Sequence, residues 1–317
     1  MWRWAEWIAD QVVAPTGLDP ARGAGAALHF FVYDLLKIVV LVSIVAFIMA
    51  LVRGALPHEK LRAKLEGRGG KLLGYPGAAL FGALTPFCSC SSVPIFLGFV
   101  QARFPIGVAF AFLITSPLVN EIAVALMAAT FGWKLALAYA AAGIGLGIAG
   151  GLALTALRAE RWLVPGATAA ADDDEAPPEG WRARLIGAAQ TSGRILKNIF
   201  PWLVGALVLG AGLHGFVPEG FFENLFAGRG SWTVPLAALI GLPLYVSANA
   251  TVPLLEAFVA KGVPLGTALA FLLSAVGVSF PELVMLRSVM TVRLLALFAG
   301  VVLVGTTIIG WIFNALH

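Results

Sequence analysis

Cysteine chemistry is the most specific feature of this chain. Its two cysteines, Cys88 and Cys90, lie one serine apart in TPFCSCSSVP, residues 85–94, within an uncharged run over 72–102. Thiolates bind soft, thiophilic species such as Cu(I), Zn²⁺ and trivalent arsenic. The pair is compatible with a ligand or substrate contact, with packing as small apolar side chains, or with a redox pair. Polar, proline-containing sequence at membrane depth is costly unless it lines a site, which favours the substrate contact.

A second polar stretch, LYVSANATVP at residues 244–253, corresponds to the first. Shifting residues 82–113 by 159 positions gives nine identities without a gap, among them Gly82 with Gly241. Small polar residues also serve to pack transmembrane helices closely, but two clusters at equivalent positions favour the lining of one cavity. The predicted substrate-binding residues are Cys88, Ser89, Cys90, Ser91, Ser92, Tyr245, Ser247, Asn249 and Thr251.

Carboxylates follow each polar stretch inside apolar sequence. TSPLVNEIAV, residues 115–124, contains Asn120 and Glu121, and SFPELVM, residues 279–285, contains Glu282. The two glutamates match if a two-residue insertion is allowed. An intramembrane carboxylate costs at least ~2.5 kcal/mol at a helix centre, so we predict proton coupling or a polar gate at Asn120, Glu121 and Glu282. Structural hydrogen bonding to nearby unwound backbone is the alternative.

Apolar helices must position these residues. The composition is 60% apolar and 12% charged with a mean hydropathy of +0.91, whereas soluble domains carry about 25% charged residues. We predict an all-α, polytopic membrane protein. Its apolar segments are 31–52, 73–102, 105–130, 134–157, 195–216, 233–259, 264–286 and 294–314. The predicted domains are an N-terminal interfacial segment, 1–30, a first transmembrane repeat, 31–157, an acidic cytoplasmic linker, 158–193, and a second repeat, 194–317.

Positive charges indicate how the segments cross the membrane, because Lys and Arg accumulate on the cytoplasmic side. If all segments cross, the charges are balanced at 10 inside and 10 outside; if 73–102 and 233–259 are re-entrant hairpins, 15 lie inside and 5 outside. A straight helix over 72–102 would also be too long for a bilayer, at about 46 Å. We therefore predict an inverted repeat in which each half has three transmembrane helices and a re-entrant, broken helical hairpin. The hairpin tips would meet at the midplane, as in secondary transporters.

Several other functions find little support in the sequence. The basic residues show no aromatic interleaving, which argues against nucleic acid, and GRGGKLLG, residues 67–74, lacks the spacing of a phosphate-binding loop. We predict no cofactor and no metal site, so transport would depend on a gradient or a partner. The glycine-rich segment 143–151 is interpreted as a close helix-packing surface.

The strings TPFCSCSSVPIFLGF and FPIGVAFAFLITSPLVNEIAV resemble the predicted-permease family that contains the bacterial trivalent organoarsenical efflux permeases (ArsP-like permeases). The resemblance covers both halves, over about residues 31–315, and implies an inner-membrane permease. Some members of the family extrude methylated or aromatic trivalent arsenicals, which are neutral, thiophilic and partly apolar. The motif positions are Cys88, Ser89, Cys90, Ser91, Ser92, Pro94, Pro117, Asn120 and Glu121.

The function predicted from residues and resemblance together is a multi-pass permease of the bacterial inner membrane, and not an enzyme. It would be a secondary transporter that exports a small thiophilic solute, such as a trivalent organoarsenical, from a site between the hairpin tips, with proton coupling at Glu121 or Glu282. The alternative is a transporter or channel for sulfur compounds or metal ions. A thiol oxidoreductase is less favoured, because it would need a second cysteine pair and the chain has no other cysteine.

Overall fold

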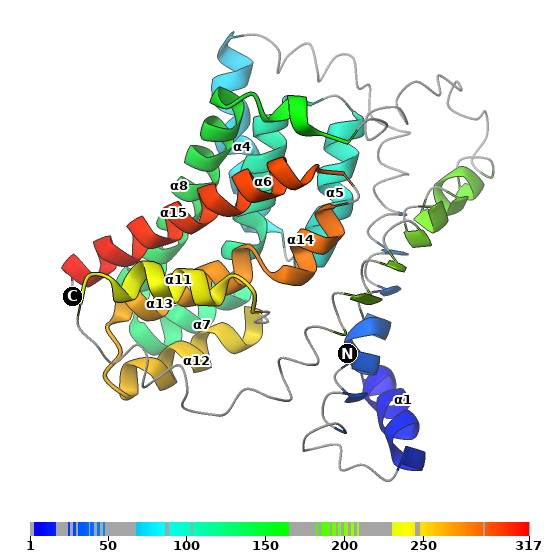
Figure 1. Cartoon of the computed structure of the whole chain (residues 1–317), viewed down its shortest axis with the longest axis horizontal. Helices are drawn as coiled ribbons and strands as arrows, with labels where there is room; N and C mark the ends of the chain where they lie inside the picture. The colour runs from blue at the N-terminus through cyan, green and yellow to red at the C-terminus, as the bar shows by residue number, and fades with distance from the viewer. Residues whose placement is uncertain are drawn as a thin grey trace.

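The computed structural model describes residues 3–16, 68–85, 89–102, 104–164, 230–244, 248–287 and 289–316, and separate helical residues between 25 and 47 and between 182 and 208. The described elements are α1 (Arg3–Val13), η1 (Ala14–Thr16), α4 (Arg68–Leu84), α5 (Ser89–Gln101), α6 (Ile106–Leu118), α7 (Glu121–Phe131), α8 (Trp133–Ala156), η2 (Ala159–Trp162), α11 (Thr233–Gly241), α12 (Ala248–Ala260), α13 (Leu265–Gly277), α14 (Phe280–Leu286) and α15 (Val292–Leu316). In this described part every named element is helical, as predicted (Figure 1).

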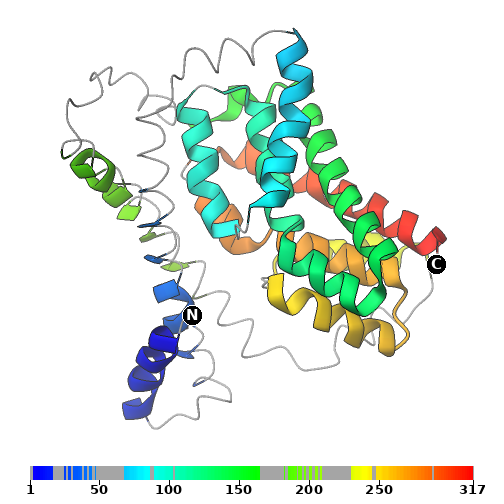
Figure 2. The same cartoon turned by 180° about the vertical axis from the view of Figure 1, so that it is seen from behind.

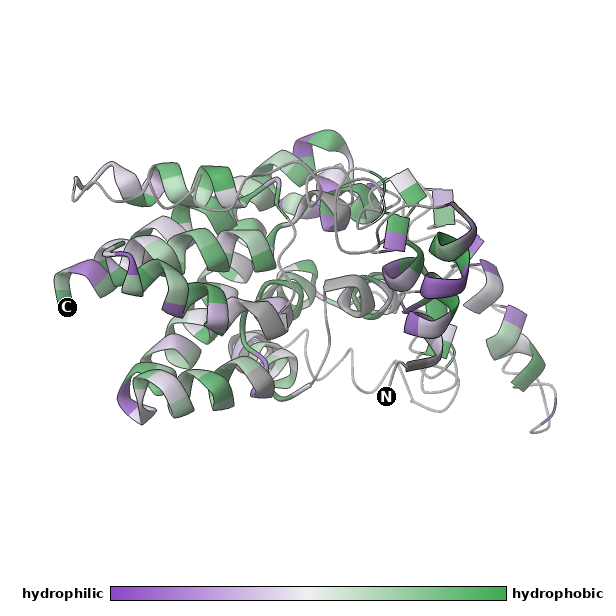
Figure 3. Ribbon diagram, turned by 90° about the horizontal axis from the view of Figure 1, so that it is seen from below, coloured by the Kyte–Doolittle hydropathy of each residue, from purple (hydrophilic) through white to green (hydrophobic). Residues whose placement is uncertain are grey.

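Three described helical stretches are long and apolar enough to cross a membrane: Trp133–Ala156, Leu265–Leu286 and Val292–Leu316. The pair α6 and α7 forms a fourth candidate, bent by 47°. These four stretches confirm the segments predicted at 105–130, 134–157, 264–286 and 294–314. Hydrophobic residues run along most of the length of these helices (Figure 3). The segments 31–52 and 195–216 lie largely outside the described residues, and the predicted domain boundaries stay predictions.

Both predicted hairpin segments are interrupted, but over fewer residues than the polar stretches suggest. Helix α4 ends at Leu84 and α5 begins at Ser89, while α11 ends at Gly241 and α12 begins at Ala248. Residues 89–94 and 248–253, at the ends of the two polar stretches, belong to α5 and α12. Figure 2 shows α5 returning in the direction opposite to α4. Their re-entry from one membrane face stays a prediction.

The two halves share helix boundaries at the 159-residue shift. Shifting α5 and α6 by 159 positions gives the bounds of α12 and α13, and the starts of α7 and α8 fall on those of α14 and α15. The insertion that would align Glu121 with Glu282 is therefore wrong, because Glu121 falls on Phe280 instead. The first turns of α7 and α14 are equivalent, but their carboxylates are not.

Equivalent contacts accompany the equivalent boundaries. A Cβ built on Gly82 in α4 would lie 3.1 Å from both the Phe112 carbonyl oxygen and the Ser116 backbone nitrogen. A Cβ on Gly241 in α11 would meet the corresponding atoms, Phe271 O at 2.4 Å and Ala275 N at 3.3 Å. A Cβ on Gly241 would force the backbone apart and one on Gly82 would be tightly placed, so the same close crossing occurs in each half.

Ring packing repeats in the same way. Phe99 meets Phe112 edge to face with centroids 5.4 Å apart, and Phe258 meets Phe271 with centroids 5.5 Å apart. These pairs pack α5 against α6 and α12 against α13 with the same edge-to-face geometry.

Glycines also let α8 approach α6. A Cβ on Gly151 would lie 2.5 Å from the Gly107 carbonyl oxygen, and a Cβ on Gly147 would lie 3.0 Å from that of Ala111. The packing interpretation of residues 143–151 is confirmed. The second half repeats this contact in α15, where a Cβ on Gly310 would lie 2.7 Å from the Gly266 carbonyl oxygen.

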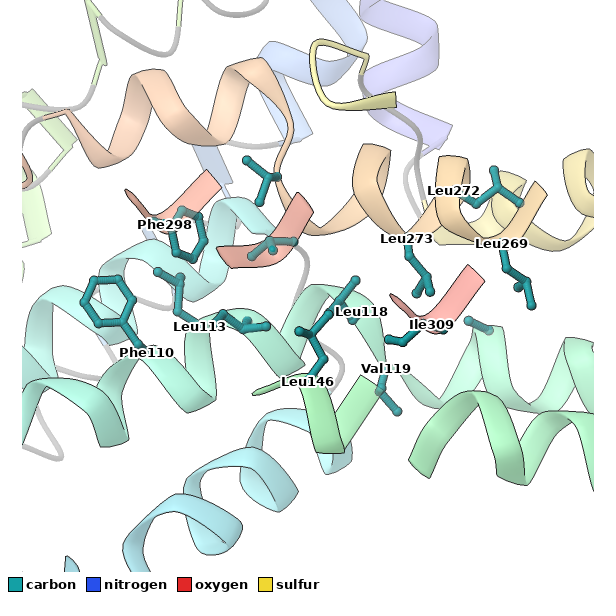
Figure 4. Packing of buried hydrophobic residues seen from close by; sticks show 14 of the residues in the cluster. Phe110, Leu113, Leu118, Val119, Leu146, Leu269, Leu272, Leu273, Phe298 and Ile309 are labelled. Atoms are coloured by element: carbon teal, nitrogen blue, oxygen red, sulfur yellow. The ribbon is translucent and has the colours of Figure 1, made fainter. Parts of the chain in front are cut away.

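The equivalent helices α8 and α15 contact each other and run in opposite directions. A Cβ on Gly150 would lie 3.3 Å from Val301, whereas Gly305, later in α15, faces Leu146, earlier in α8. Their ends agree, because the Thr291 hydroxyl before α15 donates to the Trp162 carbonyl after α8. Figure 4 shows the apolar side chains buried at the centre of the fold. This opposed packing is what an inverted repeat requires, and the orientation of each half in a membrane stays a prediction.

Candidate functional site

The first polar stretch supplies one described site residue, Ser92, in α5. Its side chain is fully buried, and its hydroxyl oxygen lies 2.7 Å from that of Ser116 in α6, with one hydroxyl donating to the other. The predicted site residue Cys88 lies outside the described residues. Ser89, Cys90 and Ser91 are placed by their backbone in the first turn of α5.

The second polar stretch supplies Thr251 in α12, which is also buried. Thr251 is the repeat equivalent of Ser92. Tyr245 and Ser247 lie outside the described residues, and Asn249 is placed by its backbone in the first turn of α12. The structure therefore places Ser92 and Thr251 at the same position of equivalent helices.

A proline lies inside each of these two helices, at Pro94 in α5 and Pro253 in α12. Proline has no backbone N–H, so the carbonyls of Cys90 and Asn249 lack the donor that would follow four residues later. The first four backbone N–H groups of any helix also lack an intrahelical acceptor. The first turns of α5 and α12 thus offer backbone donors and acceptors next to the predicted site residues.

The break between α6 and α7 is closed by local hydrogen bonds. Asn120 is 8% exposed and caps α7, its Oδ1 accepting from the backbone N–H of Ala123 at 2.7 Å. On the other side of the break, the Tyr139 hydroxyl in α8 donates to the Leu118 carbonyl. Asn120 thus has a structural role as the cap of α7, and its part in a polar gate stays a prediction. Glu121 is exposed at the first position of α7, and its role in proton coupling or as a polar gate stays a prediction.

The break between α13 and α14 is different. Glu282, in the first turn of α14, is 1% exposed. Ser279 precedes α14, but its side chain makes no capping hydrogen bond. Within the described part of the chain, the buried hydroxyls of Ser274 and Ser279 have no hydrogen-bond partner. This break combines a buried carboxylate with unused hydroxyl groups.

Two contacts between the halves join helices that begin within the polar stretches to helices that follow the breaks. Helix α5, which carries Cys90 and Ser92, contacts α14, which carries Glu282. Helix α12, which carries Thr251, contacts α7, whose N-cap is Asn120. The helix that begins within each polar stretch therefore packs on the helix that follows the break of the other half (Figure 1).

Ser116 was not predicted as a site residue. The hydrogen bond that joins it to Ser92 spans 24 residues of sequence, and no periodicity within either helix points to such a pairing. Its position beside Pro117 in TSPLVNE is the one signal that the sequence offered. The described residues contain no group of three or more His, Cys, Asp or Glu side chains that could hold a metal ion.

The profile of a protein family described as "Predicted permease" matches residues 24–315. The chain belongs to this family. The match confirms the resemblance and, with the apolar helices, supports a multi-pass membrane permease that acts on a small molecule, a transporter rather than an enzyme.

Two relatives of this permease have broad coverage. A UPF0718 protein of Methanocaldococcus jannaschii is 23% identical over 331 residues, which cover 86% of this chain and 91% of that protein. The UPF0718 protein YraQ of Escherichia coli (strain K12) is 26% identical over 250 residues, which cover 76% of this chain and 66% of that protein. No solved structure shows a significant match to the permease.

Proposed function

We propose that this permease is a secondary transporter that exports a small thiophilic solute, such as a trivalent organoarsenical, across the bacterial inner membrane. The observation that carries the proposal is the contact between α5 and α14, which belong to different halves. One helix carries Cys90 beside a polar first turn, and the other carries a carboxylate that is 1% exposed. A substrate contact and a proton-carrying group on touching helices are the two parts that coupled transport needs.

The chemistry of the first polar stretch suits a neutral arsenical. Trivalent arsenic is soft and prefers sulfur, and an organic substituent adds apolar surface. Serine hydroxyls and the backbone groups freed by Pro94 would bind the oxygen substituents of such a molecule. Release requires weak binding, so a single thiol contact from Cys88 or Cys90 serves export better than chelation by both.

Glu282 is the proton-coupling residue in this proposal. Its carboxylate is buried next to a helix break, whereas that of Glu121 is exposed. A buried carboxylate within an apolar segment is expensive, and such residues mark proton pathways in transporters. Because α14 packs on α5, a change of charge at Glu282 would act on the helix that carries Cys90.

The test is transport by the double variant Cys88→Ser with Cys90→Ser. Everted membrane vesicles that contain the permease are energised, and uptake of a trivalent phenylarsenical is followed. We expect uptake by the double variant to fall to the level of vesicles without permease, because a hydroxyl does not replace a thiol toward arsenic. The two single variants serve as internal controls, since one thiol is expected to retain part of the flux.

Undiminished uptake by the double variant would remove the thiols from the mechanism. Flux that persists after the proton gradient is collapsed, and that saturates poorly, would favour a channel instead. Uptake of thiosulfate or of soft metal ions in place of the arsenical would assign the alternative substrate class.

A further inference from the structure

Ser116 lies where both arms of the first interrupted segment meet α6. From α4, Gly82 packs so closely that a Cβ on it would lie 3.1 Å from the Ser116 backbone nitrogen. From α5, the Ser92 hydroxyl lies 2.7 Å from the Ser116 hydroxyl, and both side chains are fully buried. Ser116 of α6 thus contacts both α4 and α5, the two helices that precede and follow Cys88 in the sequence.

The first turn of α5 depends on such an external contact. Its leading backbone N–H groups have no intrahelical acceptor, and Pro94 removes the N–H that the Cys90 carbonyl would accept. The backbone of this turn is therefore weakly held by its own helix. The hydrogen bond between Ser92 and Ser116 joins the turn to α6 two residues beyond Cys90.

The second half has the same crossing without this hydrogen bond. Gly241 packs on the Ala275 backbone nitrogen as Gly82 packs on that of Ser116. Thr251 stands in the place of Ser92, but Ala275 has no hydroxyl to offer it. The hydroxyl pair thus occurs in the half that carries the thiols, and its counterpart is missing in the half that has none.

We infer that Ser116 is a positioning residue for the thiols, acting through Ser92. Its hydroxyl fixes the first turn of α5 on α6 and so sets the reactivity of the Cys90 thiol in that turn, and that of Cys88, which precedes the turn in sequence. This role rests on the proposed function, because the position of the thiols matters for transport only if they contact the arsenical. The thiol reactivity itself is measurable without transport.

The experiment uses the full-length permease in lipid nanodiscs. Mass spectrometry follows the alkylation rates of Cys88 and Cys90 by N-ethylmaleimide, and protection by phenylarsine oxide gives an apparent Kd. In Ser116→Ala we expect the rate constants to change, and the Kd to rise, by about two- to tenfold, the range that corresponds to one net hydrogen bond. Vmax of transport is expected to change by less than the KM.

Thr115→Val is the matched control. Thr115 is the neighbouring residue of α6, is equally buried, and donates its hydroxyl to the Ala111 carbonyl of its own helix at 2.8 Å. Removing that hydroxyl leaves α5 untouched, so alkylation rates and Kd should stay at their wild-type values. A change as large as that of Ser116→Ala would show that any lost hydroxyl in α6 has this effect, and would overturn the inference.

A double-mutant cycle identifies the partner. If Ser116 acts through Ser92, then Ser92→Ala reproduces the effect of Ser116→Ala, and the double variant shows no further change. Ser92→Ala also reports on the same bond from α5 if Ser116→Ala fails to fold. Fully additive effects, or wild-type thiol reactivity in Ser116→Ala, would overturn the inference.

The two proposals fail separately. Altered alkylation in Ser116→Ala together with a wild-type permease that moves no arsenical would retain the positioning role and reject the substrate. Arsenical transport by the wild type with unaltered alkylation in Ser116→Ala would retain the substrate and reject the positioning role.

Discussion

The two helix breaks of this permease lie at equivalent places, yet their polar groups are satisfied differently. In the first break, Asn120 caps α7 and the Tyr139 hydroxyl covers the Leu118 carbonyl. In the second, Ser279 makes no capping hydrogen bond, and Phe298, which has no hydroxyl, stands in the place of Tyr139. The backbone has been repeated, whereas the polar side chains that complete it have not.

We propose that this difference separates a break with a structural role from one that takes part in transport. A break whose groups are satisfied by its own half has little left to bind, and it holds one geometry. The second break keeps the buried hydroxyls of Ser274 and Ser279 without a partner in the described part of the chain, next to Glu282. Buried polar groups left unsatisfied cost stability, so their presence needs a functional explanation. We therefore place coupling at the second break and positioning at the first.

The carboxylates provide the test with the largest expected effect. Glu282→Gln keeps the size of the side chain and removes its charge, and it should reduce uptake driven by a pH gradient by about 100-fold, the scale of losing a proton-transfer group. Glu121→Gln, at an exposed position, should leave uptake within about threefold of wild type. The interaction lost is that of a first-turn carboxylate with the helix dipole, which contributes ~0.3–1 kcal/mol to helix stability. Initial rates in everted vesicles measure both.

Substrate exchange without a gradient separates coupling from binding in the same variants. Glu282→Gln should still exchange labelled for unlabelled arsenical, because its thiols are intact. Equal losses in the two glutamate variants would contradict the assignment of coupling to one break.

The glycine contacts between α6 and α8 and between α13 and α15 test whether the two halves are equally sensitive to the same substitution. Gly151→Ala and Gly310→Ala should each destabilise the fold by about 1–3 kcal/mol, because the new methyl group would meet backbone that cannot move aside. The obstructing atoms are the Gly107 carbonyl oxygen at 2.5 Å and the Gly266 carbonyl oxygen at 2.7 Å. Unfolding in mixed detergent, followed by circular dichroism, gives both free energies.

Gly145→Ala is the control for these substitutions. Gly145 lies in the same helix as Gly151, but a Cβ on it would meet nothing within 4 Å. Alanine is the better helix former by up to about 1 kcal/mol, so this variant should be as stable as the wild type or more so. A large cost at Gly151 with none at Gly310 would show that the crossings are not equivalent.

Much of the fold could be predicted from the sequence because long apolar runs and the 159-residue shift are global signals. The extent of each interruption could not be predicted, since serine and proline are tolerated within the first turns of a helix as well as in loops. Residues 89–94, which include three serines and Pro94, are helical for this reason. The pairing of Ser92 with Ser116 needed the packing of α5 on α6, which no local pattern encodes.

The capping role of Asn120 at the first break was predictable from the sequence, but the pattern was interpreted as a functional carboxylate instead. Asn120 followed by Glu121 is a helix start, with a capping amide and an acidic residue in the first turn. Interpreted as an intramembrane carboxylate, Glu121 was predicted to couple protons or to form a polar gate. Glu282, at the third position of α14, was predicted with the same argument and is the one that is buried.

The helix caps give the smallest effect and the sharpest contrast between the breaks. Asn120→Ala should destabilise the permease by about 1–2 kcal/mol, the cost of losing an N-cap, whereas Ser279→Ala should change stability by less than about 0.5 kcal/mol because no capping bond is lost. The same detergent unfolding measures both.

Ser279→Asn then reverses the comparison, since it gives the second break the residue that caps the first. If the uncapped start of α14 serves coupling, this variant gains up to about 1 kcal/mol of stability and loses transport. Stability gained with transport unchanged would instead mean that the open cap of α14 has no part in the transport cycle.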